Sequence, residues 1–210
     1  LKEEFLSPAI TGEYIGALAV SEVGGGSDVA ALKTSARKDG DDYIIDGQKM
    51  WITNAKQADF FCTLVNTSNE DPHNNKSLIV IPASIKGLTV GDKIEKLGQH
   101  TSDTAPVYFD NVRVPQRYRI GDEGKGFKIQ MQQFQEERIF LSASVLIVLE
   151  QCIIKTIEYC QDRHAFGKTI IENQSIQFRL AELQTEVEAL RSLIYRAADD
   201  FILGKDMTYL

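Results

Sequence analysis

The sequence changes its pattern between Pro115 and Gly126, and this change constrains the fold more than any other feature. Before it, short runs rich in β-branched and aromatic residues alternate with turn residues, as antiparallel strands do. After it, strand signals almost disappear and apolar residues recur at helical spacing. We therefore expect an α+β chain, in which an antiparallel β-barrel or β-sandwich of roughly 100 residues precedes a partial helical bundle.

Five runs before this change have the composition of strands. They are YIID, QKMWIT, DFFCTLV, SLIVIP and PVYFDNVRV. The dipeptide Asp46-Gly47 separates the first two runs, and Asp-Gly between apolar runs predicts a hairpin turn. Residues 2–18 are expected to form the end of a helix and a turn that leads into the first strand.

Two helices are expected after the change. Residues 127–163 form one long or kinked helix, which the segment HAFGK closes. Residues 174–203 form the second helix, which ends before Gly204. Its apolar positions follow steps of four and three residues: Ile176, Leu180, Leu183, Val187, Leu190, Ile194, Ala197 and Phe201. So long a seam predicts a bundle completed by further chain or by a second chain, and residues 206–210 are expected to start another helix.

Composition and charge narrow the classes of function. The chain is 43% hydrophobic and 25% charged, which is typical of a globular protein. Its net charge of -7 disfavours binding to nucleic acid, because neutralising phosphates requires a basic face. His73 and His100 lack metal-ligand spacing, so no metal site is expected. The most apolar run, residues 139–149, is shorter than a bilayer span, so no transmembrane segment is expected.

The segment SEVGGGSD, from Ser21 to Asp28, contains three consecutive glycines. A dinucleotide fingerprint needs spaced glycines between a strand and a helix, and a P-loop ends in Gly-Lys-Ser/Thr; neither pattern is present. A flexible linker is disfavoured, because the apolar run IGALAV leads directly into the glycines. Two alternatives remain at this point: a tight turn held for a ligand, and an unoccupied structural turn.

Seven motifs occur in one order along the chain: SEVGGGSD, QKMWITNA, LGQHTSDT, FDNVRVP, GDEGKGF, QEERI and RHAFGKTIIENQ. This ordered set resembles the acyl-CoA dehydrogenase family over essentially the whole chain. The resemblance implies three parts: the end of an N-terminal helical domain at residues 1–18, a middle β-domain at 19–118, and the first part of a C-terminal helical-bundle domain at 119–210.

The resemblance also implies a reaction. Family members oxidise an acyl-CoA thioester to the trans-2-enoyl thioester, as a carboxylate removes the α-proton and FAD accepts hydride from the β-carbon. Electron-transferring flavoprotein is the implied electron acceptor, and the mitochondrial matrix is the implied location. Two alternatives stay open: an acyl-CoA oxidase of the same fold, and a catalytically incompetent fragment or paralogue that acts as an oligomerising or binding module.

By resemblance, two segments form the FAD site. The residues are Val20, Ser21, Glu22, Gly24, Gly26, Ser27, Trp51, Ile52 and Thr53. In the family, the glycine turn approaches the pyrophosphate and the CoA arm, which also places Ser27 on the substrate side. The Trp-Ile-Thr segment lies against the flavin, with the threonine hydroxyl near N5. Ser21 stands where threonine is common, and Val23 where proline is usual.

The triplet Glu136-Glu137-Arg138 is the candidate catalytic segment. Adjacent charges on a helix are typical of a solvated patch, yet these precede the apolar run IFLSASVLIVL. In most family members the base lies near the C-terminus, outside the region matched here. In the long-chain and isovaleryl subgroup it lies on this helix, in a Glu-Arg pair. The resemblance therefore implies Glu137 as the base, with Gln135 and Arg138 on the substrate side.

The closing segment of the helical hairpin carries a third group of candidates. Arg163, Phe166 and Gln174 match family residues that reach the FAD of a neighbouring subunit, which implies a homodimer or homotetramer. The alternative is that Phe166 and Gly167 only close the hairpin.

Overall fold

The computed structural model describes residues 1–69, 71–205 and 207. The chain divides into two compact units, Leu1–Met131 and Gln132–Leu210, and each is described by itself. The three-part division expected from the family resemblance stays a prediction. The helix start expected at residues 206–210 lies outside the described residues, apart from Met207.

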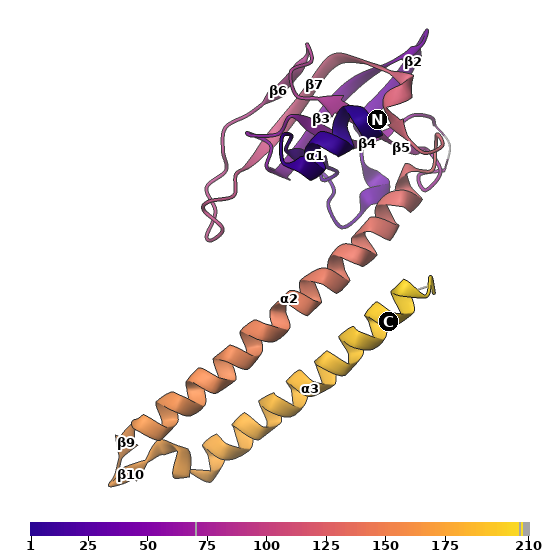
Figure 1. Ribbon diagram of the computed structural model, residues 1–210. Coiled ribbons are helices and arrows are strands. Elements are labelled where there is room, and N and C mark those ends of the chain that lie inside the picture. Colours follow the sequence, from indigo (N-terminus) through magenta and orange to yellow (C-terminus); the bar gives the residue numbers. More distant parts are fainter. Residues whose placement is uncertain (70, 206, 208–210) are drawn as a thin grey trace. The chain divides into compact units, whose positions relative to one another are not determined.

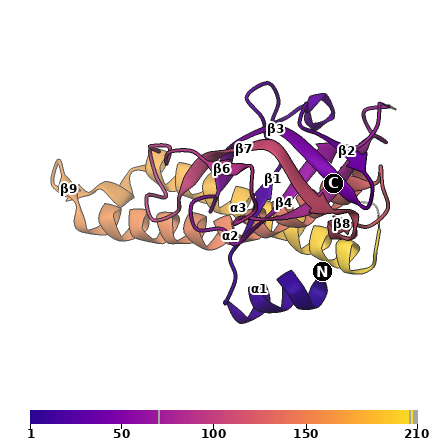
Figure 2. The same cartoon turned by 90° about the horizontal axis from the view of Figure 1, so that it is seen from above.

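The first unit contains two short N-terminal helical segments and then all the strands of the large sheet (Figure 1). Its elements are η1 (Lys2–Leu6), α1 (Ser7–Thr11), β1 (Gly16–Ala19), η2 (Val29–Ala31), β2 (Ser35–Asp39), β3 (Asp42–Thr53), β4 (Phe60–Asn66), β5 (Lys76–Pro82), β6 (Leu88–Val90), β7 (Thr104–Pro115), η3 (Gln116–Tyr118) and β8 (Arg119–Ile120). The N-terminal helical segments lie outside the sheet (Figure 2), where Phe5 packs its ring against Phe60 and Tyr118.

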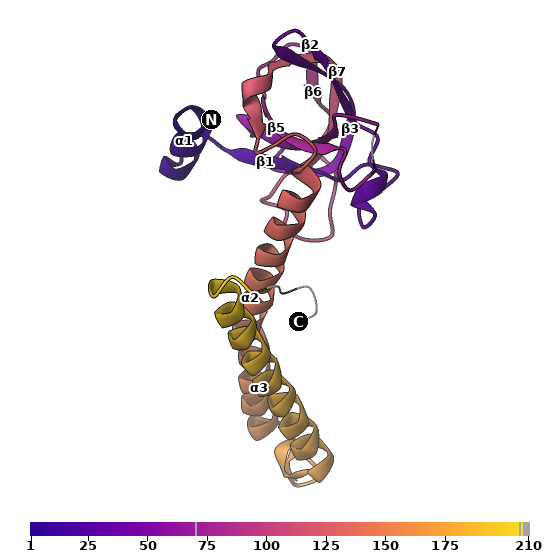
Figure 3. The same ribbon diagram turned by 90° about the vertical axis from the view of Figure 1, so that its right-hand side faces the viewer.

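The sheet is mixed rather than purely antiparallel. Its strand order is β6-β7-β3-β2-β4-β5-β8, and β1 adds to β4. Most neighbours are antiparallel, but β4 pairs in parallel with both β1 and β2. The sheet curls around an interior (Figure 3), but its end strands β6 and β8 do not pair among the described residues, so the barrel is not closed. The expected class of a β-domain followed by helices is confirmed, and the purely antiparallel pairing was wrong.

The hairpin predicted at Asp46-Gly47 was also wrong. Strand β3 continues through Gly47 from Asp42 to Thr53, and its pairing with β7 shifts register there. The turn lies instead at Gly40, which connects β2 to β3 with φ of 61°. Gly47 has φ of 142°, and a Cβ on it would lie 2.7 Å from the Cα of Thr34. The glycine therefore permits close backbone approach within β3, opposite a bulge in β7, which is the other common use of glycine in sheets.

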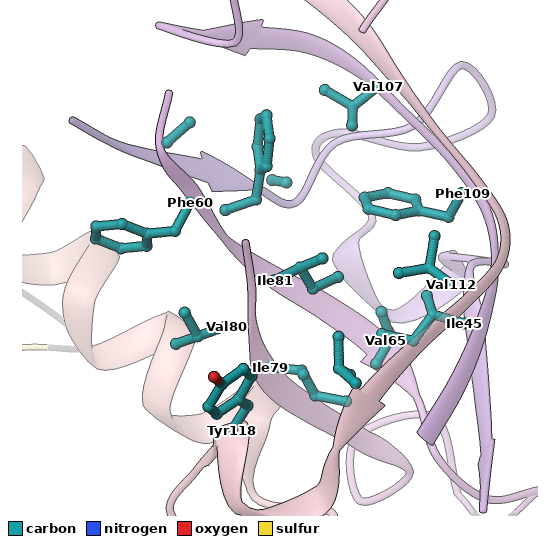
Figure 4. Close-up of a cluster of buried hydrophobic side chains, with 14 of the residues drawn as sticks. Ile45, Phe60, Val65, Ile79, Val80, Ile81, Val107, Phe109, Val112 and Tyr118 are labelled. Atoms are coloured by element: carbon teal, nitrogen blue, oxygen red, sulfur yellow. The ribbon is translucent and has the colours of Figure 1, made fainter. Parts of the chain in front are cut away.

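The core of the first unit lies inside the curled sheet. Strands β3, β5 and β7 each direct alternating or continuous apolar side chains into it, as strands with one or two buried faces do. Figure 4 shows part of this cluster, including Ile45, Ile79, Ile81, Val107, Phe109 and Val112. Because these side chains are almost fully buried, the sheet provides a rigid support for the segments at its edges.

The second unit is mainly a helical hairpin. Helices α2 (Gly126–Asp162) and α3 (Gln174–Ile202) lie side by side (Figures 1 and 2), joined by β9 (His164–Ala165), β10 (Lys168–Thr169) and η4 (Ile170–Glu172). Both helices agree with the predicted ranges to within one residue at each end. The predicted seam is buried at Leu180, Val187 and Ile194, which pack with Leu146 and Ile153 of α2.

Helix α2 exposes many large apolar side chains. Its exposed large apolar side chains are Phe140, Leu141, Val145, Ile147, Val148, Ile154 and Tyr159. By length and composition alone, α2 is also apolar enough to cross a membrane, which the run at residues 139–149 did not suggest. The expected lack of a membrane segment therefore stays a prediction.

Candidate active site

The glycine segment forms a closed turn. The N–H of Glu22 donates to the carbonyl oxygen of Gly25 at 2.8 Å, and the N–H of Gly25 donates back to Glu22 at 3.1 Å. A Cβ on Gly25 would lie 3.0 Å from the carbonyl oxygen of Asp28, whereas one on Gly24 would meet nothing within 4 Å. The segment is therefore a tight turn with open space beside Gly24, and not a linker.

A buried ion pair lies beneath this turn. Lys49 Nζ, whose side chain is fully buried, lies 2.9 Å from Glu22 Oε1 and donates to the carbonyl oxygen of Val20 at 3.0 Å. The Glu22 carboxylate also accepts hydrogen bonds from the backbone N–H groups of Lys33 (2.8 Å) and Thr34 (3.0 Å). The Glu22 side chain is thus occupied by bonds within the chain and is not free to bind a ligand.

The two charges shift each other's pKa. Burial lowers the pKa of Lys49 to about 8, and the attraction of Glu22 opposes this effect. For Glu22, burial acts to raise the pKa. The Lys49 charge and the hydrogen bonds from Thr34 and Lys33 outweigh it and hold the pKa below the usual value.

The Trp51 segment lies next to the turn. The N–H of Met50 donates to the carbonyl oxygen of Ser21 at 2.9 Å, which joins the two segments directly. Trp51 has φ of 61°, and the pairing with β7 shifts register between Lys49 and Ile52. A left-handed backbone is rare for a bulky residue and is typical of functional sites. The Trp51 ring remains 51% exposed, while Ile52 is buried.

The LGQHTSDT motif fixes the chain just after this segment. Asp103 accepts hydrogen bonds from the backbone N–H of Lys56 at 2.9 Å and from Gln57 Nε2 at 3.0 Å. Its carbonyl oxygen accepts the N–H of Asn54 at 3.1 Å, next to the strand pair of Thr53 with Thr104. Three of the motifs, far apart in sequence, are therefore joined around the C-terminal end of β3.

An open pocket of about 560 Å³ lies beside the turn. It is lined by Glu22, Val23, Gly24, Ala31, Lys33, Thr34, Gly47, Gln48, Tyr108 and Phe109. Neither Trp51 nor Thr53 lines it, so this pocket is separate from the exposed Trp51 ring.

The helical unit carries the candidate base. Glu136, Glu137 and Arg138 are exposed on α2, and Gln135 is half-buried. Glu137 Oε2 accepts a hydrogen bond from Gln133 at 3.2 Å. In the described part of the chain, the Arg138 guanidinium lies over the ring of Phe134 at 5.8 Å rather than against Glu137. The side chains of the triplet are thus accessible, as a group that meets a substrate must be.

The closing turn of the hairpin presents an aromatic ring. Phe166 and Gly167 have φ of 52° and 79°, the backbone that a two-residue β-hairpin turn requires. The Phe166 side chain is fully exposed. Arg163 and Gln174 are also exposed, at the end of α2 and the start of α3. The alternative that Phe166 and Gly167 only close the hairpin therefore stays open, because this backbone is the one that the turn itself requires.

Comparison with known proteins identifies the family. The profile described as "Acyl-CoA dehydrogenase, middle domain" matches residues 17–112, and "Acyl-CoA dehydrogenase, C-terminal domain" matches residues 124–207. The chain belongs to the acyl-CoA dehydrogenase family. A short-chain specific mitochondrial acyl-CoA dehydrogenase of Rattus norvegicus is 36% identical over 94% of the chain and 48% of its own length. The crystal structure of an acyl-CoA dehydrogenase from Geobacillus kaustophilus has a TM-score of 0.91 and 39% identity, over 98% of this chain and 55% of that one. A second structure, described as an FAD-dependent dehydrogenase, has a TM-score of 0.89 and 31% identity, over 95% of this chain and 54% of that one.

This member of the acyl-CoA dehydrogenase family thus spans about half the length of the relatives it matches. The rat relative is named for short-chain substrates, whereas the Glu137-Arg138 pair resembles the long-chain and isovaleryl subgroup. The subgroup and the substrate are therefore taken up below as proposals.

Sequence reasoning missed Lys49 and Asp103, whose hydrogen bonds join the segments of the candidate site in this acyl-CoA dehydrogenase relative. A signal for Lys49 was present, because alternation along the strand places it on the inward face with Tyr43 and Ile45. Asp103 lies within the LGQHTSDT motif, but no local pattern indicated its role, because its partners lie more than 40 residues earlier in the chain.

Proposed function

We propose that this chain is part of an FAD-dependent acyl-CoA dehydrogenase, which converts an acyl-CoA thioester to the trans-2-enoyl-CoA. One observation carries the proposal. In a chain matched to both family domains, a closed glycine turn is hydrogen-bonded to a strand that holds an exposed tryptophan in a left-handed conformation.

The residues present fit FAD. The space beside Gly24 and the exposed Ser27 leave the turn open to a phosphate group, and the Trp51 ring offers a face for stacking. Because Val20, Glu22 and Ile52 have buried side chains, they would contact the cofactor through their backbones. The remaining proposed contacts are Ser21, Gly26 and Thr53. When bound, FAD supplies the acceptor for the hydride of the β-carbon.

Glu137 is the proposed base of the reaction. The α-proton of a thioester is far less acidic than a carboxylic acid, so its removal requires a positioned carboxylate and stabilisation of the developing enolate. The exposed carboxylate of Glu137 is free of an ion pair with Arg138 among the described residues. Arg138, Gln135 and Ser27 then position the substrate. This assignment favours a long-chain or branched-chain substrate.

The proposed partners follow from the second unit and the family. Exposed Phe166, with Arg163 and Gln174, supports a homodimer or homotetramer in which this turn reaches the cofactor of a neighbour. Electron-transferring flavoprotein is the proposed electron acceptor. Relatives of similar identity come from mitochondria and from bacteria, so the proposed matrix location rests on the mitochondrial relatives only.

Anaerobic titration with acyl-CoA tests the proposal. The chain loaded with FAD should lose its visible flavin absorption on addition of an acyl-CoA of suitable length. Glu137→Gln should retain FAD and slow the bleaching by roughly 100-fold to 10,000-fold, the usual contribution of a general base. Glu136→Gln, the adjacent exposed carboxylate, is the matched control and should react as the wild type does.

Three outcomes would change the proposal. Equal bleaching in Glu137→Gln would place the base elsewhere in the protein. Rapid reoxidation of the reduced flavin by oxygen would favour the oxidase alternative. Failure of the wild-type chain to bind FAD would favour the non-catalytic module.

A further inference from the structure

Lys49 is buried but contacts the glycine turn at two points. Its ammonium donates to the carbonyl oxygen of Val20, the first residue after β1, and pairs with Glu22, the first residue of the closed turn. The backbone of Lys49 belongs to β3, where it pairs with Val107 in the core. One side chain therefore joins the end of β1, the turn and the rigid sheet.

The same strand carries Trp51 two residues later. Between Lys49 and Ile52 the strand shifts register, and Trp51 takes its left-handed conformation there. The peptide hydrogen bond from Met50 to Ser21 is the second tie between this bulge and the turn. One backbone bond and the Lys49 ammonium thus tie the turn directly to the strand that carries Trp51.

Stability alone does not account for a charged pair at this place. A buried ion pair contributes little net stability compared with apolar side chains of the same volume, because both charges lose their hydration. The pair instead fixes geometry, because the ammonium holds the carboxylate and the carbonyl oxygen that surround it in defined positions. The charge of Lys76 also acts on Lys49, but it repels the Lys49 ammonium and therefore does not hold it in place.

Lys76 provides an internal comparison. It is equally buried, but its Nζ donates to neutral oxygens only: the carbonyls of Ala30 and Pro72, at 2.8 Å each, and Asn75 Oδ1 at 3.0 Å. None of these atoms belongs to the glycine turn or to the Trp51 segment. Lys76 therefore shares the burial of Lys49 but not its position.

We propose that Lys49 is a positioning residue, which holds the glycine turn in register with Trp51 and thereby sets the affinity of the cofactor site. The part of this inference that concerns the cofactor rests on the function proposed above. The part that concerns the turn does not, because its contacts lie within this chain.

The test uses a double variant that keeps the interior neutral. Lys49→Met alone leaves the Glu22 carboxylate buried without its partner and is at risk of unfolding. In Lys49→Met/Glu22→Gln, the single amide oxygen keeps one of the two hydrogen bonds that the carboxylate accepts, from Lys33 at Oε2 or from Thr34 at Oε1. We expect this variant to fold, and hydrogen exchange at the amides of Gly25 and Met50 to accelerate roughly tenfold or more. The dissociation constant of FAD should rise by roughly tenfold or more, with a changed visible flavin spectrum.

Lys76→Met is the matched control. It removes a lysine of equal burial from the same unit, so it should lower the unfolding midpoint but leave exchange at Gly25 and Met50, the FAD affinity and the flavin spectrum unchanged. If both lysine variants weaken FAD equally, Lys49 has only a structural role.

The two proposals fail in different ways. Unchanged exchange at Gly25 and Met50 in the folded double variant overturns the inference, whatever the flavin result. Unchanged FAD affinity with faster exchange overturns its cofactor part. If wild-type protein binds no FAD, the proposed function falls, while the exchange measurement still decides whether Lys49 holds the turn.

Discussion

At the scale of single residues, Gly47 shows how one position determines the path of a strand. A Cβ on this residue would lie 2.7 Å from both the Cα and the Oγ1 of Thr34, and its φ of 142° is rarely adopted by other residues. Gly47→Ala should therefore destabilise the first unit by roughly 1–3 kcal/mol through overpacking and backbone strain. Urea unfolding followed by the fluorescence of Trp51, the single tryptophan, measures this loss. Gly98→Ala is the control, because a Cβ there meets nothing within 4 Å. If Gly47→Ala lost no more unfolding free energy than Gly98→Ala, close backbone approach would not explain the glycine at position 47.

At the scale of elements, the seam between α2 and α3 supports the hairpin. Leu180 is buried in the cluster that joins the two helices, so Leu180→Ala should remove roughly 2–5 kcal/mol of unfolding free energy from the second unit. Thermal unfolding followed by ellipticity at the helix band provides the measurement. Glu186→Ala, on the exposed face of the same helix, should change the free energy by no more than about 0.5 kcal/mol. Equal effects of the two substitutions would show that the seam is not the source of stability.

The elements also show how far sequence reasoning extends. Both long helices were predicted to within a residue, because the regular steps along α3 and the Gly204 stop signal are local features. The prediction of a hairpin at Asp46-Gly47 was wrong because the glycine serves the close approach of Thr34, which is distant in sequence. Motif order indicated the turn and the Trp51 segment as a site. The bonds that join them depend on tertiary register, which no local pattern contains.

At the scale of the whole molecule, the ionisable groups with shifted pKa values predict how stability changes with pH. Glu4, Glu22, Glu172 and Asp200 have lowered pKa values. In acid the unfolded chain binds more protons than the folded one at these groups. The stability that they provide is present above their ordinary pKa values and is lost as pH falls through the lowered ones.

Lys49 acts in the same direction on the alkaline side. The folded chain releases its proton near the lowered pKa of about 8, whereas the unfolded chain keeps it until about 10.5. Between these values the unfolded state binds more protons, so this group makes the free energy of unfolding rise with pH. From about pH 7 to about pH 9, the rise should be on the order of 1 kcal/mol.

Lys76, whose pKa is also lowered, acts in the same direction. Subtracting the unfolding free energy of a Lys49 variant from that of the wild type separates the two contributions. Urea unfolding of wild type and of Lys49→Met/Glu22→Gln at both pH values measures this difference. A wild-type advantage that stays constant or shrinks would show that the Lys49 charge is not lost in this range, and that the attraction of Glu22 outweighs burial.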